Sequence, residues 1–244
     1  MGSEMCIRDR FDSLFGDSRF SAVFQFYAAI TKLRISRPFL SKLPYWLRPV
    51  PAGVLDLVRK ILKKQSSWKV LSQPKPLLVS LLHCLYEAQD PSLCQFVAEQ
   101  LEGKLDLRFT SLNPVDCLAV GHFISSVSLT TISVEEFTVD LESCSLGDAC
   151  TKSLMQSICR SVNTHSTVNT HLNVHLDNNE IHEEGSSHIA NVLSRTSVIS
   201  HLLLGYIWGG NPIGDKGLQT IFDTLKQNNT LKRLDVYYLS LIHI

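Results

Sequence analysis

The segment Asn178–Leu193, NNEIHEEGSSHIANVL, contains the residues of this chain that most resemble a metal site. His182 stands next to Glu183, and His188 follows six positions after His182. A zinc-binding H-E-x-x-H helix needs its histidines four positions apart, because that spacing puts both on one helical face. The further histidines His165, His171, His175 and His201 add no tight ligand spacing. The pattern favours solvated histidines, and we expect no metal.

Other catalytic and cofactor patterns are equally weak. No segment matches the phosphate loop G-x-x-x-x-G-K-[ST], and GDKG at Gly214–Gly217 falls in a turn of the repeat described below. His83 and Cys84 lie on an apolar helix, where a satisfied core position is preferred to a Cys–His catalytic pair. The sequon at Asn228 fits a polar turn. We therefore predict no catalytic or cofactor-binding residue and no enzymatic activity.

The composition is that of a folded globular protein. Of 244 residues, 23 are basic, 23 are acidic and 44% are hydrophobic. A formal net charge of zero gives no reason to expect nucleic acid or an anionic membrane as a partner. No apolar run reaches the roughly 18 residues that span a bilayer, and the first residues contain no apolar signal-peptide core. The seven cysteines include no C-x-x-C pair and lie mostly among apolar residues, which favours reduced thiols in a cytoplasmic protein.

The two ends of the chain differ from the rest. EMCIRDR near the start and LSLIHI at the end resemble translated sequencing-adapter read-through. We interpret residues 1–10 and 239–244 as sequencing artefacts and leave them out of fold reasoning. On this interpretation the chain is a fragment, an internal piece of a longer protein.

Residues 11–103 have the pattern of an all-helical region. Apolar residues recur at helical spacing in the segments 21–33, 52–64 and 76–89. Another helix is predicted to begin after Asp90, which is a good cap and precedes Pro91 at the first helical position. No strand pattern competes in this part of the chain.

Residues 104–238 contain internal repeats of the form L-x-x-L-x-L-x-x-N/C-x-L, a strand followed by a turn and a helix. Cys144, Asn179 and Asn211 occupy the Asn or Cys position of three copies. The third copy is interrupted by Ile207–Gly210, and a fourth begins at Leu231. A degenerate copy, an N-terminal cap of the array, is predicted from Leu105, with Asn113 and Pro114 starting its helix. Strands are expected at 139–141, 174–176, 202–204 and 234–236, parallel and separated by helices.

The template predicts an α/β solenoid, a horseshoe segment that follows the helical region. Its leucines fill the space between strand and helix, and one copy alone has no neighbour against which to bury them. The Asn or Cys side chains are expected to hydrogen-bond backbone groups of neighbouring turns. Gly185 and Gly217, six residues after Asn179 and Asn211, are expected to help the backbone turn toward the helix.

The side chains between and just after the inward leucines point away from the core, toward a concave surface that we predict to bind a partner. They are Thr138, Asp140 and Glu142 in the first copy, Asn173, His175 and Asp177 in the second, His201, Leu203 and Gly205 in the third, and Arg233, Asp235 and Tyr237 in the fourth. Aromatic and arginine side chains are the commoner binding hot spots. The strongest contacts are therefore predicted near Arg233 and Tyr237, whereas the turn residue His182 is not expected to bind.

LDNNEIHEEGSSHIANVL and GNPIGDKGLQTIFDTLKQNNTLKRLDV resemble the ribonuclease-inhibitor-type leucine-rich repeats of the NLR family, the intracellular NACHT and leucine-rich-repeat receptors. VFQFYAAITKL resembles the helical segment that follows the NACHT ATPase, with Gln25–Ala29 in the place of the family's QEFLAA motif. LLHCLYEAQDPSLCQFV resembles the NACHT-associated helices that lead into the repeats. The likeness extends over roughly residues 17–236, and no residue matches the family's nucleotide-binding motifs.

This resemblance implies a non-catalytic, protein-binding or autoinhibitory segment of a cytoplasmic innate-immunity receptor. Its partner would be a protein or microbial ligand, together with an intramolecular contact to an upstream NACHT domain, and neither nucleic acid nor membrane. The alternative is a stand-alone ribonuclease-inhibitor-like repeat protein that acts as an inhibitor or scaffold.

Overall fold

The computed structural model describes residues 75–127, 134–163, 171–206 and 209–237. Within this part the fold is α/β, with two helices first and then strands alternating with helices. The elements are α4 (Pro76–Ala88), α5 (Pro91–Gln100), β1 (Lys104–Asp106), α6 (Pro114–Ser126), β2 (Glu136–Asp140), α7 (Gly147–Asn163), β3 (His171–His175), α8 (Glu183–Arg195), β4 (Ile199–Tyr206), β5 (Gly209–Gly210), α9 (Gly214–Leu225) and β6 (Arg233–Val236). The helices predicted at 21–33 and 52–64 and both suspected artefacts lie outside the described residues.

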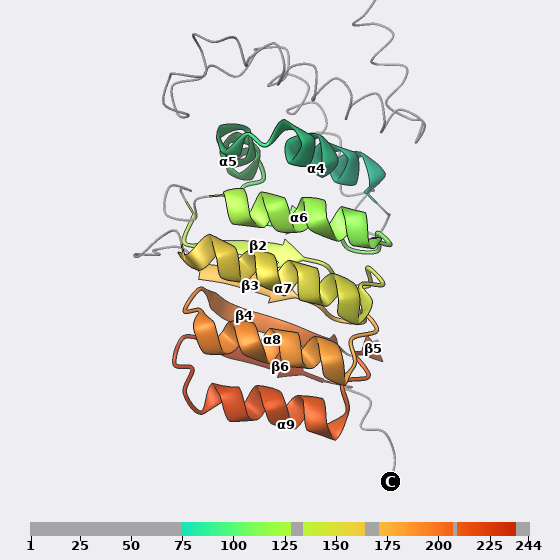
Figure 1. Cartoon of the computed structure of the whole chain (residues 1–244), viewed down its shortest axis with the longest axis vertical. Coiled ribbons are helices and arrows are strands. Elements are labelled where there is room, and N and C mark those ends of the chain that lie inside the picture. The colour runs from blue at the N-terminus through green and yellow to red at the C-terminus, as the bar shows by residue number, and fades with distance from the viewer. Residues whose placement is uncertain (1–74, 128–133, 164–170, 207–208, 238–244) are drawn as a thin grey trace, which may run out of the picture.

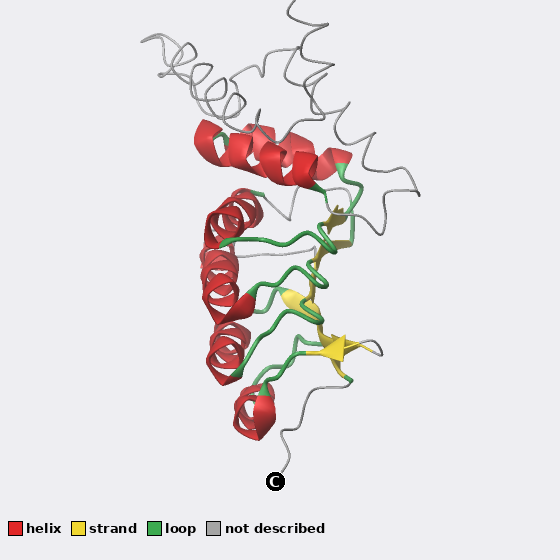
Figure 2. Cartoon of the chain, turned by 90° about the vertical axis from the view of Figure 1, so that its right-hand side faces the viewer, coloured by secondary structure: helices red, strands yellow, loops and turns green. Residues whose placement is uncertain are grey.

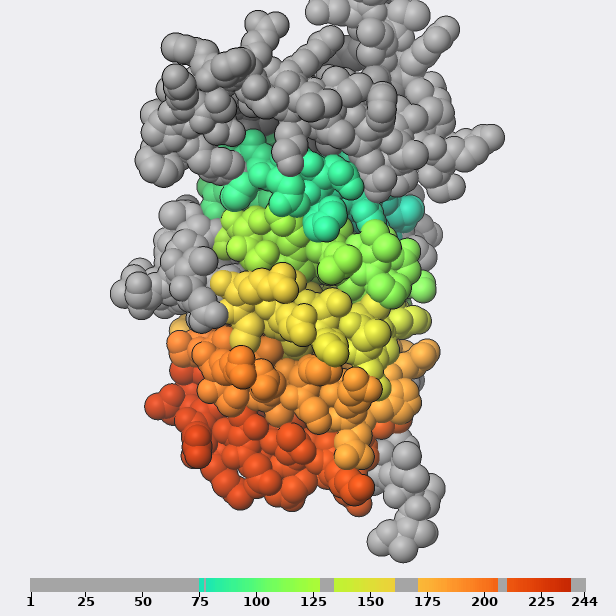
Figure 3. Space-filling model, in the orientation of Figure 1, coloured from blue at the N-terminus to red at the C-terminus, as the bar shows by residue number. Residues whose placement is uncertain are grey.

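The sheet has the order β1-β2-β3-β4-β6, and each strand in that series is parallel to its neighbours. Figure 1 shows the strand–helix units stacked along the long axis of the molecule. Figure 2 shows helices α6 to α9 in one layer and the strands in the other, with α4 and α5 lying across the end of the stack. In the space-filling view the units follow one another as bands from α4 to α9 (Figure 3). The predicted parallel strands with helices between them are confirmed.

Two details of the predicted strands need correction. The strands β2 and β3 end at Asp140 and His175, so Leu141 and Leu176 lie just beyond them, although the Leu141 amide still donates to the His175 carbonyl at 3.0 Å. The insertion at 207–210 includes β5, which pairs antiparallel with Gly205 and Tyr206 of β4. The insertion therefore interrupts the repeat pattern between β4 and Asn211, and Asn211 still occupies the Asn position of the template.

Helices α5 and α6 begin at the predicted caps. The Asp90 carboxylate accepts from the amides of Ser92 and Leu93, and Pro91 takes the first helical position. Asn113 and Asp116 form a reciprocal capping box, in which the Asn113 side chain accepts from the Asp116 amide and the Asp116 side chain accepts from the Asn113 amide. These caps satisfy backbone donors that have no partner inside a helix.

The core lies between the strand layer and the helix layer. Val139 and Leu141 from the strand side meet Leu154 and Ile158 from α7, and all four are at most 1% exposed. The corresponding residues of the next unit, including Leu176 and Ile189, are fully buried as well. Each unit therefore buries its apolar residues against itself and its neighbours, as the predicted spacing requires.

The predicted role of Gly185 and Gly217 is wrong. Both residues lie inside helices, α8 and α9, and neither has a positive φ. A Cβ at Gly185 would collide with the Asp148 carboxylate, and one at Gly217 would collide with the Ser186 hydroxyl. Glycine is needed here because the neighbouring helix approaches closely, not because the backbone turns.

Candidate functional site

A ladder of hydrogen bonds joins successive turns at the Asn and Cys positions of the template. Asn211 Nδ2 donates to the carbonyls of Leu176 and Leu204, and its Oδ1 accepts from the amides of Asn179 and Ile181 at 2.8 and 3.2 Å. Asn179 repeats this pattern one unit earlier, with Leu141 and Asp177 as acceptors and Cys144 and Leu146 as donors. Both side chains are fully buried.

Cys144 takes the same position in the first copy. Its Sγ donates to the carbonyls of Leu107 and Glu142 at 3.1 and 3.5 Å, the bonds that correspond to those of Asn179 Nδ2. Burial raises the pKa of the Cys144 thiol to about 12, so the thiol remains protonated and able to donate. The prediction that these three side chains bond the backbone of neighbouring turns is confirmed.

The strand register brings the predicted partner-binding residues into rows that cross the sheet. One row contains Lys104, Thr138, Asn173, His201 and Arg233, and the next contains Asp106, Asp140, His175, Leu203 and Asp235. Because side chains alternate along a strand, both rows lie on the sheet face opposite the core. We call this face the strand surface. A binding role for it stays a prediction.

Several predicted residues are largely covered by their neighbours in this structure. Asp140, Asn173 and Asp177 are only 3–5% exposed, and Gly205 is also buried, so these four residues expose little area to a partner. Asn173 is buried because its side chain bonds both Glu136 and the Ser200 hydroxyl. Thr138, Glu142, His175, His201, Leu203 and Asp235 are half-buried. Arg233 is exposed and Tyr237 is 66% exposed, which leaves the last unit with the most accessible side chains.

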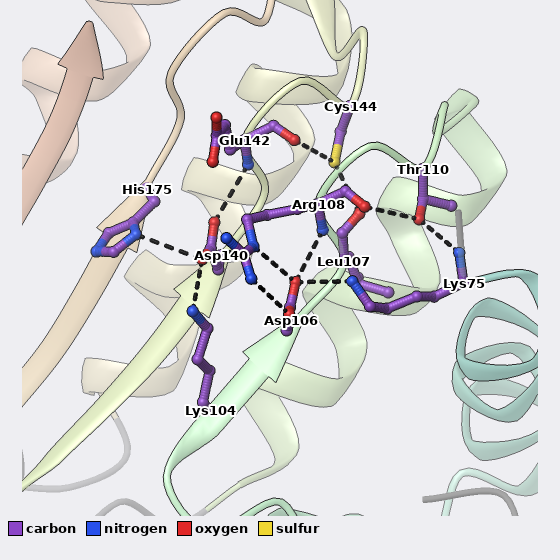
Figure 4. Close-up of polar contacts among 10 residues, drawn as sticks. All are labelled: Lys75, Lys104, Asp106, Leu107, Arg108, Thr110, Asp140, Glu142, Cys144 and His175. Carbon is purple, nitrogen blue, oxygen red and sulfur yellow. Dashed lines mark hydrogen bonds and ion pairs between the residues drawn. The ribbon is translucent and has the colours of Figure 1, made fainter. Parts of the chain in front are cut away.

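A network of charges occupies the first units of the strand surface (Figure 4). The Asp106 carboxylate binds Lys75 Nζ at 3.0 Å and Arg108 Nη2 at 3.1 Å. The Asp140 carboxylate binds Lys104 Nζ at 2.7 Å, Arg108 Nε at 3.3 Å and His175 Nδ1 at 3.6 Å. Arg108 therefore bridges the carboxylates of two strands, and Lys75 ties the start of α4 to β1.

The network fixes the protonation of its acids. Burial alone would raise the pKa of Asp140, but hydrogen bonds from His175 and Lys104 and the charge of Lys104 outweigh it and hold this pKa at about 2. Burial would also raise the pKa of Asp106, but hydrogen bonds from Arg108 and Lys75 outweigh it, so this pKa is lowered. Asp177 differs, because burial and repulsion from Glu142 and Asp140 raise its pKa to about 6.

The segment that resembled a zinc site has a structural explanation. Asp148 Oδ1, on α7, accepts from the His182 and Gly185 amides at 2.8 and 3.0 Å and so caps α8 from the neighbouring unit. The His182 side chain is exposed, with Nδ1 3.6 Å from Asp148. Within the described ranges, no three His, Cys, Asp or Glu side chains are placed to hold a metal ion. In the same ranges, no helix has the length and apolarity to cross a bilayer.

The other weak chemical patterns also have structural explanations. His83 is a satisfied core histidine, as predicted, with Nε2 2.6 Å from Asp116 Oδ1. Burial raises the pKa of the adjacent Cys84 to about 12, so its thiol is not an activated nucleophile. Asn228 Nδ2 donates to the Leu193 carbonyl, and its Oδ1 accepts from the amides of Thr230 and Leu231, which confirms a polar turn. The six cysteines of the described part are free.

Sequence reasoning missed Lys75, Lys104, Asp106 and Arg108. The one available signal was the register of the degenerate first copy, in which Asp106 and Arg108 are equivalent to Asp140 and Glu142. No model of a known protein family matches this chain.

Proposed function

We propose that residues 104–238 form a leucine-rich-repeat segment of an NLR-like cytoplasmic receptor and act in protein recognition rather than catalysis. The observation that carries this proposal is the ladder at Cys144, Asn179 and Asn211. It occurs at the template's Asn or Cys position in three successive units and joins the turns that follow neighbouring parallel strands. A buried row of side-chain amides between turns suits a solenoid, because it satisfies backbone groups that no sheet or helix pairs.

The partner-binding region is assigned to the strand surface near its last unit. Arg233 and Tyr237 are exposed there, and both residue types are enriched among binding hot spots. The ion pair of Arg233 Nη2 with Asp235 Oδ2, at 3.1 Å, is exposed and therefore contributes little to folding. If Arg233 leaves Asp235 to pair with a partner, this chain therefore loses little of its own stability.

The helices before the repeats favour a receptor over a stand-alone repeat protein. Helix α4 packs against α6, and the pairs Lys75–Asp106 and His83–Asp116 join it to the first unit. A stand-alone ribonuclease-inhibitor-like protein has no need of such a helical segment. The partner we propose is the upstream NACHT domain of the same receptor, held inactive by the strand surface until a protein or microbial ligand replaces it.

The experiment compares charge reversals on opposite sides of the last units, made in the full chain. Arg233→Glu changes the strand surface, and Lys216→Glu makes the same charge change on exposed α9. The NACHT domain encoded by the same transcript is expressed separately, and its affinity for each full chain is measured. We expect Arg233→Glu to weaken binding at least about tenfold, as loss of a hot spot does, and Lys216→Glu to leave it unchanged.

His182→Ala, on the turn between β3 and α8, provides a second control because His182 is exposed and outside the strand surface. If His182→Ala or Lys216→Glu abolishes binding while Arg233→Glu retains it, the partner docks elsewhere and the assignment is wrong.

A further inference from the structure

Asp177 is a buried carboxyl with an unused hydrogen-bond acceptor. Its side chain is 3% exposed, and Oδ1 has no hydrogen-bond partner. An acceptor left in this state is unusual, because a buried polar atom without a partner costs free energy. Asp177 stands directly after β3, on the strand surface, two residues beyond His175.

The surroundings of Asp177 explain why its Oδ1 has no partner. On the β2 side the nearby charges are those of the acids Asp140 and Glu142. The cations of this region, Lys104, Arg108 and His175, form their ion pairs with Asp140. On the β4 side, Leu203 stands opposite His175, and Gly205, two residues on, offers no side chain. No ion pair within 4 Å reaches Asp177 or Glu142 in the described part of the chain. Figure 4 shows the Glu142 carboxylate lying apart from the cations that surround Asp140.

We propose that Asp177 and Glu142 together form a binding position for an arginine side chain of the protein partner. This inference rests on the proposed function, because it supplies the chemistry of what docks on the strand surface. A guanidinium group fits two neighbouring carboxylates, since it is planar and carries five donors. Glu142 is half-buried and offers the accessible carboxylate, and the desolvated Asp177 beside it strengthens the attraction.

An incoming cation lowers the pKa of Asp177, which the free protein holds above its ordinary value. In the free protein, burial and the neighbouring acids raise its pKa to about 6, and the facing charges are His175, Glu142 and Asp140. A guanidinium within about 4–6 Å lowers a carboxyl pKa by roughly one to three units. Because Oδ1 has almost no exposed area, docking includes a turn of the carboxylate about its Cβ–Cγ bond, a soft rotation.

The test uses the full chain with carbon-13 in its Asp and Glu carboxyl groups, observed by NMR. The probe is N-acetyl-arginine amide, and the matched neutral probe is N-acetyl-citrulline amide, which has nearly the same shape without the charge. We expect the arginine probe to shift the Asp177 and Glu142 carboxyl signals saturably and to lower the Asp177 pKa by about one unit or more. The citrulline probe is expected to leave both unchanged.

Two variants connect the response to the site. Asp177→Asn keeps the shape of the side chain and should remove the saturable shift at Glu142, whereas Asp223→Asn, on exposed α9, should keep it. If Asp177→Asn fails to fold, Glu142→Gln takes its place, and it should weaken the response at Asp177 at least fivefold. Equal shifts with citrulline, uniform shifts at all surface carboxyls, or full binding by Asp177→Asn or Glu142→Gln would overturn the inference. The receptor experiment with Arg233→Glu can still succeed in that case, so the two failures are distinguishable.

Discussion

Replacing Asn179 with alanine tests whether the ladder holds the units together. The Asn179 side chain is fully buried and makes four hydrogen bonds. Its Nδ2 donates to the carbonyls of Leu141 and Asp177 at 2.6 and 3.1 Å, and its Oδ1 accepts from the Cys144 and Leu146 amides at 2.8 and 3.4 Å. Alanine leaves these backbone groups buried without that partner.

The magnitude follows from the number of bonds. A net loss of about 1 kcal/mol per hydrogen bond, with the weak 3.4 Å contact counted as little, gives roughly 3–5 kcal/mol. This is a large part of the about 5–15 kcal/mol by which a typical domain is stable. Asn191→Ala is the control, because Asn191 is exposed on α8 and should change the free energy of unfolding by less than about 0.5 kcal/mol.

The assay is urea unfolding of the full chain, combined with amide hydrogen exchange. Asn179→Ala should lower the unfolding free energy and speed exchange most at the Cys144 and Leu146 amides, which lose their acceptor. A loss below 1 kcal/mol, or faster exchange spread evenly over both neighbouring units, would refute the reasoning that the ladder joins turn to turn.

Three further predictions concern the core, a cap and pH. Leu176→Ala should lower the unfolding free energy by about 2–5 kcal/mol and His182→Ala by less than about 0.5 kcal/mol, and equal losses in denaturation would mean that the repeat register is wrong. Asp148→Ala removes the cap of α8 and should cost about 1 kcal/mol, with faster exchange of the His182 and Gly185 amides; unchanged exchange would contradict the cap. Because the Asp177 pKa of about 6 lies above its unfolded value, stability should rise by about 2 kcal/mol as pH falls from 7 to about 4, and Asp177→Asn should remove this rise. Asp140, with its pKa of about 2, contributes stability that is present above about pH 4 and lost as pH falls toward 2; a profile flat from pH 7 to 2 would contradict both shifts.

The parts of the fold that depend on local spacing were predictable from sequence. Leucine alternation located the strands, and the residues six to fourteen positions after Asn179 located α8. The caps at Asp90 and Asn113 were also readable, because a cap is decided by residues within one helical turn. These inferences need no knowledge of which segments meet in space.

The rest depended on contacts between units. Lys75 pairs with Asp106 over 31 positions, and Asp148 caps α8 over 34 and 37 positions, so neither partner is visible in a local window. The role of Gly185 was misjudged for the same reason, because its neighbour is Asp148 on another helix. Burial of Asp140 and Asp177 was missed because strand alternation gives the face on which a side chain lies, not how closely the neighbouring rows cover it.

The measurement that tests the central proposal most directly is the sequence of the full-length transcript that encodes this chain. An NLR-like receptor requires a NACHT ATPase before the helical region, so we expect a phosphate loop, G-x-x-x-x-G-K-[ST], encoded upstream of residue 11. A complete transcript with no such motif ahead of the repeats would contradict the receptor and leave a stand-alone repeat protein.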